Sequence, residues 1–146
     1  MKYFCNPILV AILVFCFSSP VFSQNTTTKE IERLKKIAQE VTIIRDNWGI
    51  AHVYGKTDAD AVFGMLYAQC EDDFKRVEMN YIEKLGRLSE INGKSVLYND
   101  LEIKLLIDVE EAKADYKKAA PWLKKLLNSY ADGINFYLHN HPEVKP

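Results

Sequence analysis

The sequence predicts an α+β chain that is mostly helical and has a short β-hairpin near its N-terminus. Two runs of β-branched and aromatic residues, 41–44 and 50–54, flank turn residues at 46–49, which is the pattern of a hairpin. After residue 57 the apolar side chains recur at steps of three and four, which is typical of amphipathic helices. Of the 146 residues, 48% are hydrophobic, so the chain can bury a core and is not disordered.

Residues 1–23 have the three parts of a secretory signal peptide. A positive start precedes ten apolar residues at 8–17, and Ser23 ends a cleavage site. Ten helical residues extend about 15 Å, which is too short to span a bilayer. Lipidation of Cys16 is the alternative, but Phe15 is large where such sites need a small neighbour. We therefore expect cleavage after Ser23 and a secreted or periplasmic protein that leaves the membrane with its leader removed.

Charge and cysteine content exclude several classes of protein. The 19 basic and 20 acidic residues give a net charge of −1 with no basic block, so we expect no nucleic-acid partner. Two of the three cysteines, Cys5 and Cys16, lie in the predicted leader. Cys70 alone cannot form an internal disulfide. It lies on an apolar helical stripe, which favours a small buried hydrophobic residue over a nucleophile.

Residues 24–40 are expected to form a flexible polar start followed by a short helix. Apolar residues at helical spacing predict this helix over 30–39. The β-branched run 41–44 predicts a strand that is buried on both faces. Turn residues at 46–49 and a second strand at 50–54 complete the predicted hairpin.

A long helix is predicted to begin after Thr57, which suits an N-cap because Asp60 can close a capping box. We expect this helix to be interrupted near Gly86. Its predicted apolar face consists of Val62, Phe63, Leu66, Cys70, Phe74, Val77, Tyr81, Leu85 and Leu88.

Two further helices are predicted towards the C-terminus. One of them is predicted from apolar residues at steps of three and four, which are Leu101, Leu105, Val109, Ala112 and Tyr116. The alternation at 103–109 also suits a strand, but residues 110–118 lack strand formers, so we favour the helix. Pro121 suits the first position of the last helix. Its predicted apolar face is Trp122, Leu126, Tyr130, Ile134 and Leu138.

No complete active site is recognisable in the sequence. A hydrolytic triad needs a hydroxyl or thiol, a base and an orienting group. The candidates after the leader are Ser89, Ser95, Ser129, His52, His139 and His141, and no serine lies in a glycine elbow. His139, His141 and Glu143 have the residue types of a metal site, but alternating histidines near a chain end fit a frayed surface better.

The remaining charged clusters suggest no chemistry either. The acidic run 71–73 is expected to be a solvated face, and Glu78 and Glu83 are ordinary charges on a helix surface. We therefore predict no catalytic, cofactor-binding or metal-ligating residue in this chain.

Several motifs in order resemble the penicillin acylase family. The first is Val41-Thr42-Ile43-Ile44-Arg45-Asp46-Asn47-Trp48-Gly49-Ile50-Ala51-His52-Val53-Tyr54. The next are Thr57, Asp60-Ala61, Phe63-Gly64-Met65-Leu66-Tyr67-Ala68, Glu71-Asp72, Val77-Glu78-Met79 and Gly86-Arg87-Leu88-Ser89-Glu90. The last is Tyr130-Ala131-Asp132-Gly133-Ile134-Asn135. Ala51 replaces a usual Pro and Asp73 a common Arg, which leaves the subfamily, and hence the acyl preference, open.

The resemblance implies an exported amidase of the N-terminal nucleophile class, close to the acyl-homoserine-lactone and aculeacin acylases. Residues 41–146 would be the N-terminal segment of its α chain, an incomplete part of a four-layer αββα fold. In this class a precursor cuts itself, and a Ser that begins the β chain acts as nucleophile and base. The implied partners are that β chain and a small N-acyl amide, such as a β-lactam or an acyl-homoserine lactone. Calcium is expected in the complete enzyme, held mainly by the β chain.

The matching residues receive structural roles only. Arg45 and Asp46 are expected to anchor the hairpin turn through charged hydrogen bonds. Gly49 and Gly64 are expected to allow close backbone approach, and Phe63, Tyr67 and Met79 are expected to pack the core. The alternative to an amidase segment is a non-catalytic exported helical binding module, or the remnant of a decayed acylase, because an incomplete α chain would expose apolar faces.

Overall fold

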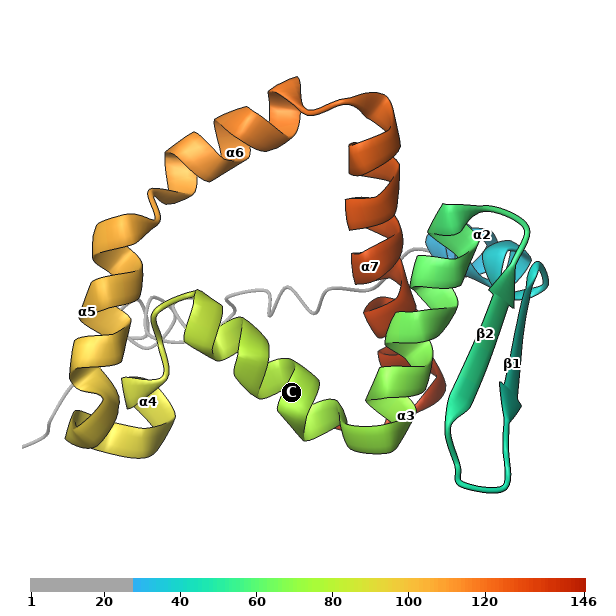
Figure 1. Ribbon diagram of the computed structural model, residues 1–146, viewed down its shortest axis with the longest axis horizontal. Coiled ribbons are helices and arrows are strands. Elements are labelled where there is room, and N and C mark those ends of the chain that lie inside the picture. The colour runs from blue at the N-terminus through green and yellow to red at the C-terminus, as the bar shows by residue number, and fades with distance from the viewer. Residues whose placement is uncertain (1–27) are drawn as a thin grey trace, which may run out of the picture.

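The computed structural model describes residues 28–146 (Figure 1). Its elements are α2 (Thr28–Ala38), β1 (Val41–Arg45), β2 (Ala51–Gly55), α3 (Asp58–Lys84), α4 (Ser89–Asn92), the 3-10 helix η1 (Gly93–Val96), α5 (Leu97–Leu106), α6 (Val109–Lys118) and α7 (Pro121–Asn140). The predicted mostly helical chain with one hairpin is confirmed. The expected leader lies outside the described residues. Within residues 28–146, no helix has the length and apolarity needed to cross a membrane.

The hairpin pairs β1 with β2 in antiparallel register, with Val41 opposite Gly55 and Arg45 opposite Ala51. The strand prediction is confirmed, but the expectation that β1 is buried on both faces is wrong. Val41 is half-buried, whereas Ile44 on the opposite face is 55% exposed. Only one face of the hairpin packs on a helix, so alternate residues of β1 remain in solvent.

Helix α3 begins at the predicted capping box. The Thr57 hydroxyl accepts a hydrogen bond from the Asp60 amide at 3.3 Å, and the Asp60 carboxylate accepts one from the Thr57 amide at 2.9 Å. The hairpin then packs closely on Gly64, as predicted. A Cβ at this position would lie 2.5 Å from Val41 Cγ1 and 2.7 Å from Val53 Cγ1, so glycine sets the distance between hairpin and helix.

The predicted interruption of α3 near Gly86 is confirmed, because the helix ends at Lys84 and Gly86 has φ +62°. A second interruption was not predicted. Asp73 leaves the helical conformation, with φ −161° and ψ 78°. Its carboxylate accepts a hydrogen bond from the Arg76 amide at 3.0 Å, which is how an N-cap restarts a helix. Asp73 is exposed, as expected of the acidic run, and it also caps the restart at which α3 bends.

The single helix predicted through Leu101 and Tyr116 is wrong. The structure has two helices there, because Ile107 is extended and α6 restarts after Asp108. The Asp108 carboxylate accepts hydrogen bonds from the amides of Glu110 at 2.8 Å and Glu111 at 3.0 Å. An aspartate followed by acidic residues is an N-terminal signal, and here it outweighs the continuous apolar period.

Helix α7 begins with Pro121 at its first position, as predicted. Ile134 and Leu138 of the predicted apolar face pack against the core, but the most buried residues of the helix are others. The buried residues are Ser129, Gly133 and Tyr137, whereas Trp122 is 66% exposed. A Cβ at Gly133 would lie only 2.4 Å from the carbonyl oxygen of Phe63 in α3. The two helices therefore approach through small residues, which a search for apolar residues does not find.

The core lies between α3, α7 and α2. Leu34, Phe63, Leu66 and Cys70 are almost fully buried, so the predictions for Phe63 and Cys70 are confirmed. Tyr67 packs against this core, and the ring centroids of Phe63 and Phe136 are 5.6 Å apart. Met79 is only half-buried and lies beyond the core.

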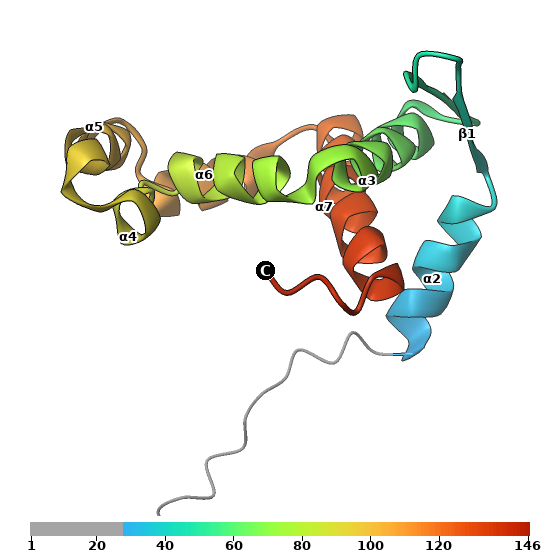
Figure 2. The same ribbon diagram turned by 90° about the horizontal axis from the view of Figure 1, so that it is seen from below.

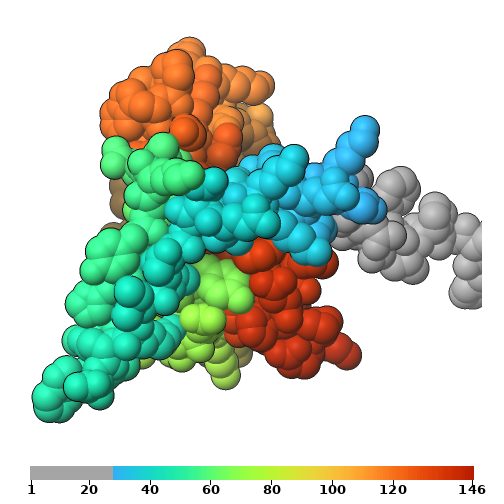
Figure 3. Space-filling view, turned by 90° about the vertical axis from the view of Figure 1, so that its right-hand side faces the viewer, coloured from blue at the N-terminus to red at the C-terminus, as the bar shows by residue number. Residues whose placement is uncertain are grey.

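Two regions can be distinguished in the views of Figures 1 and 2. The packed unit comprises residues 28–77 and 129–146, which contain α2, the hairpin and the adjoining parts of α3 and α7. Figure 3 shows α2 lying between the hairpin and α7 on one face of this unit. The arc comprises residues 78–128, in which the end of α3, α4, η1, α5, α6 and the start of α7 follow one another around an open centre. The arc and the packed unit share α3 and α7.

Candidate functional site

The hairpin turn is held by Asp46 and Gly49. The Asp46 carboxylate accepts hydrogen bonds from the amides of Trp48 and Ile50, both at 2.9 Å. The Ile50 amide, and the His52 ring 3.3 Å away, hold the pKa of Asp46 below its usual value despite partial desolvation. Gly49 has φ +80° and open space where a side chain would lie. It therefore serves the backbone conformation of the turn, and the prediction of close approach at Gly49 is wrong.

Arg45 connects this turn to α3. Its guanidinium donates to the carbonyl oxygen of Gly49 at 3.0 Å, and it forms ion pairs with Glu71 at 3.0 Å and Asp72 at 2.7 Å. The hydrogen bond to Glu71 raises the pKa of Arg45 further above its usual value. The predicted anchoring role of Arg45 and Asp46 is confirmed. Glu71 and Asp72 are its partners and not merely a solvated face.

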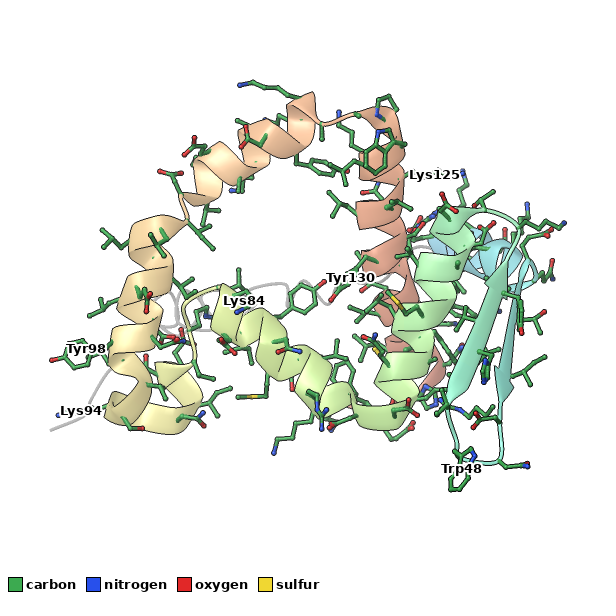
Figure 4. The ribbon with its side chains drawn as sticks, in the orientation of Figure 1. Trp48, Lys84, Lys94, Tyr98, Lys125 and Tyr130 are labelled. Atoms are coloured by element: carbon green, nitrogen blue, oxygen red, sulfur yellow. The ribbon has the colours of Figure 1, made fainter. Side chains whose placement is uncertain are left out.

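A cleft of about 390 Å³ lies beside the hairpin turn, between β2 and α3. It is lined by Trp48, Gly49, Ile50, Ala51, Val53, Met65, Ala68, Gln69 and Asp72. Trp48 projects from the tip of the hairpin, away from the packed unit (Figure 4), and is 89% exposed. Exposed tryptophans are frequent anchors in protein interfaces, and the described residues that line this cleft include no serine, cysteine or histidine.

The histidines near the C-terminus are not one frayed group. His139 is exposed, but the His141 ring stacks on Tyr137 with centroids 4.2 Å apart. Nδ1 of His141 lies 2.9 Å from the Tyr137 carbonyl oxygen, so this nitrogen carries the proton when the hydrogen bond forms. The expected frayed surface is therefore wrong for His141. Across residues 28–146, no three His, Cys, Asp or Glu side chains gather in a way that could hold a metal ion.

No serine or cysteine in the described residues is hydrogen-bonded to a histidine. Cys70 is 1% exposed, and burial raises the pKa of its thiol to about 11, so the reactive thiolate is rare at neutral pH. Ser129 is buried in the contact between α3 and α7. Ser95 donates its hydroxyl to the Asn92 carbonyl oxygen at 3.2 Å. None of these groups contacts a histidine within residues 28–146.

A concave surface larger than the cleft beside the hairpin turn lies on the arc, where a groove of about 930 Å³ follows α5 and α6. It is lined by Lys84, Leu85, Ile103, Lys104, Leu105, Ile107, Asp108, Val109, Glu110, Ala112, Lys113, Tyr116 and Lys117. Its apolar side chains are open to solvent, with Leu105 85% exposed and Val109 56% exposed. Figure 4 shows Lys84 at the end of α3 and Tyr130 on α7, both facing the centre of the arc. The sequence did not indicate this groove, because α5 and α6 were predicted to be one continuous helix.

The fold of residues 28–146 resembles part of a penicillin acylase chain. The structure superposes on thermostable penicillin G acylase from Alcaligenes faecalis with a TM-score of 0.63 and 21% identity, covering 73% of this chain and 58% of that chain.

The sequence comparisons identify the family. The family model described as penicillin amidase matches residues 40–146. Acyl-homoserine lactone acylase QuiP of Pseudomonas fluorescens (strain Pf0-1) is 29% identical over 119 residues, which are 82% of this chain and 15% of that protein. Penicillin G acylase of Escherichia coli is 23% identical over 139 residues, covering 93% and 15%. The chain therefore belongs to the penicillin amidase family, and it spans about 15% of the length of these curated relatives.

Proposed function

We propose that this chain is the N-terminal part of an exported amidase that hydrolyses linear amide bonds of N-acylated compounds. The observation that carries the proposal is the family match over residues 40–146, in a chain whose described residues hydrogen-bond no serine or cysteine to a histidine. Relatives named acyl-homoserine lactone acylase and penicillin G acylase support N-acyl amides, including acyl-homoserine lactones or β-lactams, as the substrate class.

In this proposal the chemistry belongs to a Ser at the N-terminus of a separate β chain. The Ser hydroxyl attacks the amide carbon while the α-amino group takes the hydroxyl proton, and the C–N bond breaks with transfer of a proton to the leaving amine. Water then hydrolyses the acyl ester. Donors of the β chain would stabilise the oxyanion. The packed unit would act as scaffold, with the Arg45 network fixing the hairpin against α3.

Calcium is the metal that the family resemblance implies. The described residues do not fit a calcium site, because calcium takes six to eight oxygen ligands, while Glu71 and Asp72 are engaged by Arg45. Asp100 is likewise occupied by the amides of Leu88 and Ser89. Any calcium of the complete enzyme would therefore be held by residues outside 28–146.

The test compares the chain alone with its extended reading frame. We expect the extended protein to cut itself, to expose a new N-terminal Ser and to release the amine from an acyl amide, and the 146-residue chain to be inactive. Substituting the new N-terminal Ser by Ala is the matched control and should abolish both reactions. Activity in the 146-residue chain would contradict the assignment of the nucleophile to another chain, and an extended frame without autocleavage would contradict the amidase.

Export is proposed from the predicted leader alone. Expression in a Gram-negative host, followed by N-terminal sequencing of the periplasmic fraction, should find a chain that begins at Gln24. An uncleaved cytoplasmic chain would contradict export without bearing on the hydrolase family.

The competing function is a free-standing binding module. The exposed apolar side chains of the arc, such as Leu105 and Leu106, favour a chain that needs a partner. Size-exclusion chromatography and circular dichroism distinguish the two, since a fully folded, stable monomer would favour the module.

A further inference from the structure

The lining of the groove on α5 and α6 contains more basic than acidic residues. Its apolar floor is bordered by Lys84, Lys104, Lys113 and Lys117, against two acidic residues, Asp108 and Glu110. Other acidic residues of the same helices, Glu102, Glu111 and Asp115, do not line the groove. A nearly neutral chain therefore presents a basic border around one apolar surface.

The two acidic residues of the lining are already occupied. The Asp108 carboxylate caps α6 by accepting hydrogen bonds from the Glu110 and Glu111 amides. Glu110 itself forms an ion pair with Lys113 at 2.7 Å. The same ion pair engages Lys113, and Lys84 lies 3.3 Å from the carboxylate of Glu83.

The other two lysines of the lining, Lys104 and Lys117, form no ion pair with a carboxylate within residues 28–146. Lys104 nevertheless lies close enough to Asp100 and Glu90 to help lower the pKa of both carboxylates. The Lys104 side chain runs along Gly86, where a Cβ would lie 3.0 Å from its Cγ and 3.2 Å from its Cε.

Near the end of α6, the Lys124 ammonium donates a hydrogen bond to the Lys117 carbonyl oxygen. The same ammonium lies 5.9 Å from the centre of the Tyr116 ring. Among the described residues, Lys104 in α5 and Lys117 in the last turn of α6 thus give the lining a lysine without an ion pair from each helix.

We propose that this groove binds an acidic amphipathic helix of the polypeptide that completes the amidase. Its apolar face would cover Leu105, Val109 and Tyr116, and its carboxylates would pair with Lys104 and Lys117, as in other helix-in-groove contacts. The inference rests on the proposed function. The curated relatives are long enough to supply such a segment, since this chain matches about 15% of them. A single fatty carboxylate has one charge and cannot pair with both lysines.

The experiment uses two synthetic peptides of about 20 residues, the length of a helix that spans the groove. Both have Leu at helical spacing on one face, and the other face is Glu-rich in one peptide and Lys-rich in its twin. Binding to the purified chain is measured by fluorescence anisotropy. We expect the Glu peptide to bind at least about tenfold more tightly at low salt, and this preference to fall steeply towards about 0.5 M NaCl.

Charge-reversal variants locate the contact. Lys104→Glu combined with Lys117→Glu should abolish or invert the preference. The matched control is Lys94→Glu combined with Lys125→Glu, because these exposed lysines lie outside the groove lining (Figure 4), and it should retain the preference. If circular dichroism shows that the first variant is unfolded, the salt dependence of the peptide preference and a Leu105→Asp variant still test the groove.

Several outcomes would overturn the proposal. They are equal binding of both peptides, a preference that both double variants retain, displacement of the Glu peptide by laurate at equal affinity, and a stable dimer of the chain that Leu105→Asp dissociates. The last two would assign the groove to a fatty acid or to a second copy. Failure here leaves the autocleavage test untouched, and failure of autocleavage leaves the charge preference measurable.

Discussion

The packed unit and the arc bury their side chains in opposite ways. In the packed unit, Leu34, Phe63 and Leu66 are almost fully removed from solvent. Throughout residues 78–128, the one buried side chain is the carboxylate of Asp100, while leucines such as Leu105 remain exposed. The same residue types therefore form a core in one region and an uncovered surface in the other.

The arc is held mainly by local hydrogen bonds. Asp108 caps α6, Asp100 receives the amides that begin α4, and Arg87 pairs with Glu90 at 2.7 Å. Helices α5 and α6 have ten residues each, which is shorter than the ~12–15 residues that isolated helices need to be stable in water. The packed unit is therefore held together by a buried core, whereas the arc relies on local hydrogen bonds.

The largest contrast is expected when one substitution is made in both regions. Leu34→Ala truncates a fully buried side chain, so we expect the free energy of unfolding to fall by about 2–5 kcal/mol. Leu105→Ala changes a side chain that is 85% exposed, so its effect should stay within about 0.5 kcal/mol. Urea denaturation followed by circular dichroism measures both. Equal losses would show that the arc and the packed unit do not differ as described.

The contact between α3 and α7 gives the next effect. Gly133→Ala places a Cβ 2.4 Å from the Phe63 carbonyl oxygen, and backbone atoms must move to accept it. We expect a loss of about 1–3 kcal/mol, although alanine is the better helix former. Asn135→Ala, an exposed change two residues away on α7, is the control and should be neutral. If Gly133→Ala instead raises the free energy of unfolding, α3 and α7 pack less closely than the structure shows.

The sequence predicted the elements of the packed unit better than the surfaces they bury. Thr57 with Asp60 and Pro121 mark helix starts through local hydrogen bonding and fixed backbone angles, so a single sequence reveals them. The sequence did not predict the whole contact face of α7, because part of it consists of the small residues Ser129 and Gly133, which allow α3 to approach closely. Hydrophobic periodicity selects Trp122 and Tyr130 instead, which this chain leaves exposed.

The arc was predicted less well for a related reason. An unbroken apolar period from Leu101 to Tyr116 suits one helix, and it overrode the capping signal at Asp108. From the sequence, Asp73 is interpreted as part of a solvated acidic run and as a departure from the family pattern, although an aspartate within an apolar helix can cap a restart. For the candidate site, the anchoring roles of Arg45 and Asp46 followed from the family motif, while the groove required the break at Asp108 to be known.

Removing one helix cap from each region should give a smaller, again unequal, pair of effects. Thr57→Ala deletes the cap of α3, the central helix of the packed unit, so we expect global stability to fall by about 1 kcal/mol. Asp108→Ala deletes the cap of α6, and should increase amide hydrogen exchange within α6 while leaving the urea midpoint unchanged. A shift of the midpoint by Asp108→Ala as large as that by Thr57→Ala would show that the arc unfolds together with the packed unit.

The smallest expected effect is the pH response of the Asp100 carboxylate. Burial alone would raise the pKa of Asp100, but hydrogen bonds from Ser89 and the Leu88 amide outweigh it and hold the pKa below its usual value. A folded pKa below the unfolded value, about 3.9, means that the carboxylate stabilises the arc above that pH. The contribution is lost as the pH falls through the folded pKa.

Hydrogen exchange of the Leu88 and Ser89 amides measures this contribution directly. At neutral pH we expect Asp100→Asn to lower their protection, and the difference from the unmodified chain to vanish once Asp100 is protonated. The Leu66 amide in the packed unit serves as the internal control and should not respond to the substitution at any pH. A pH-independent difference would show that shape rather than charge joins α5 to α4. A parallel response at Leu66 would show that the one buried side chain of the arc also supports the core, and that the two regions form a single cooperative unit.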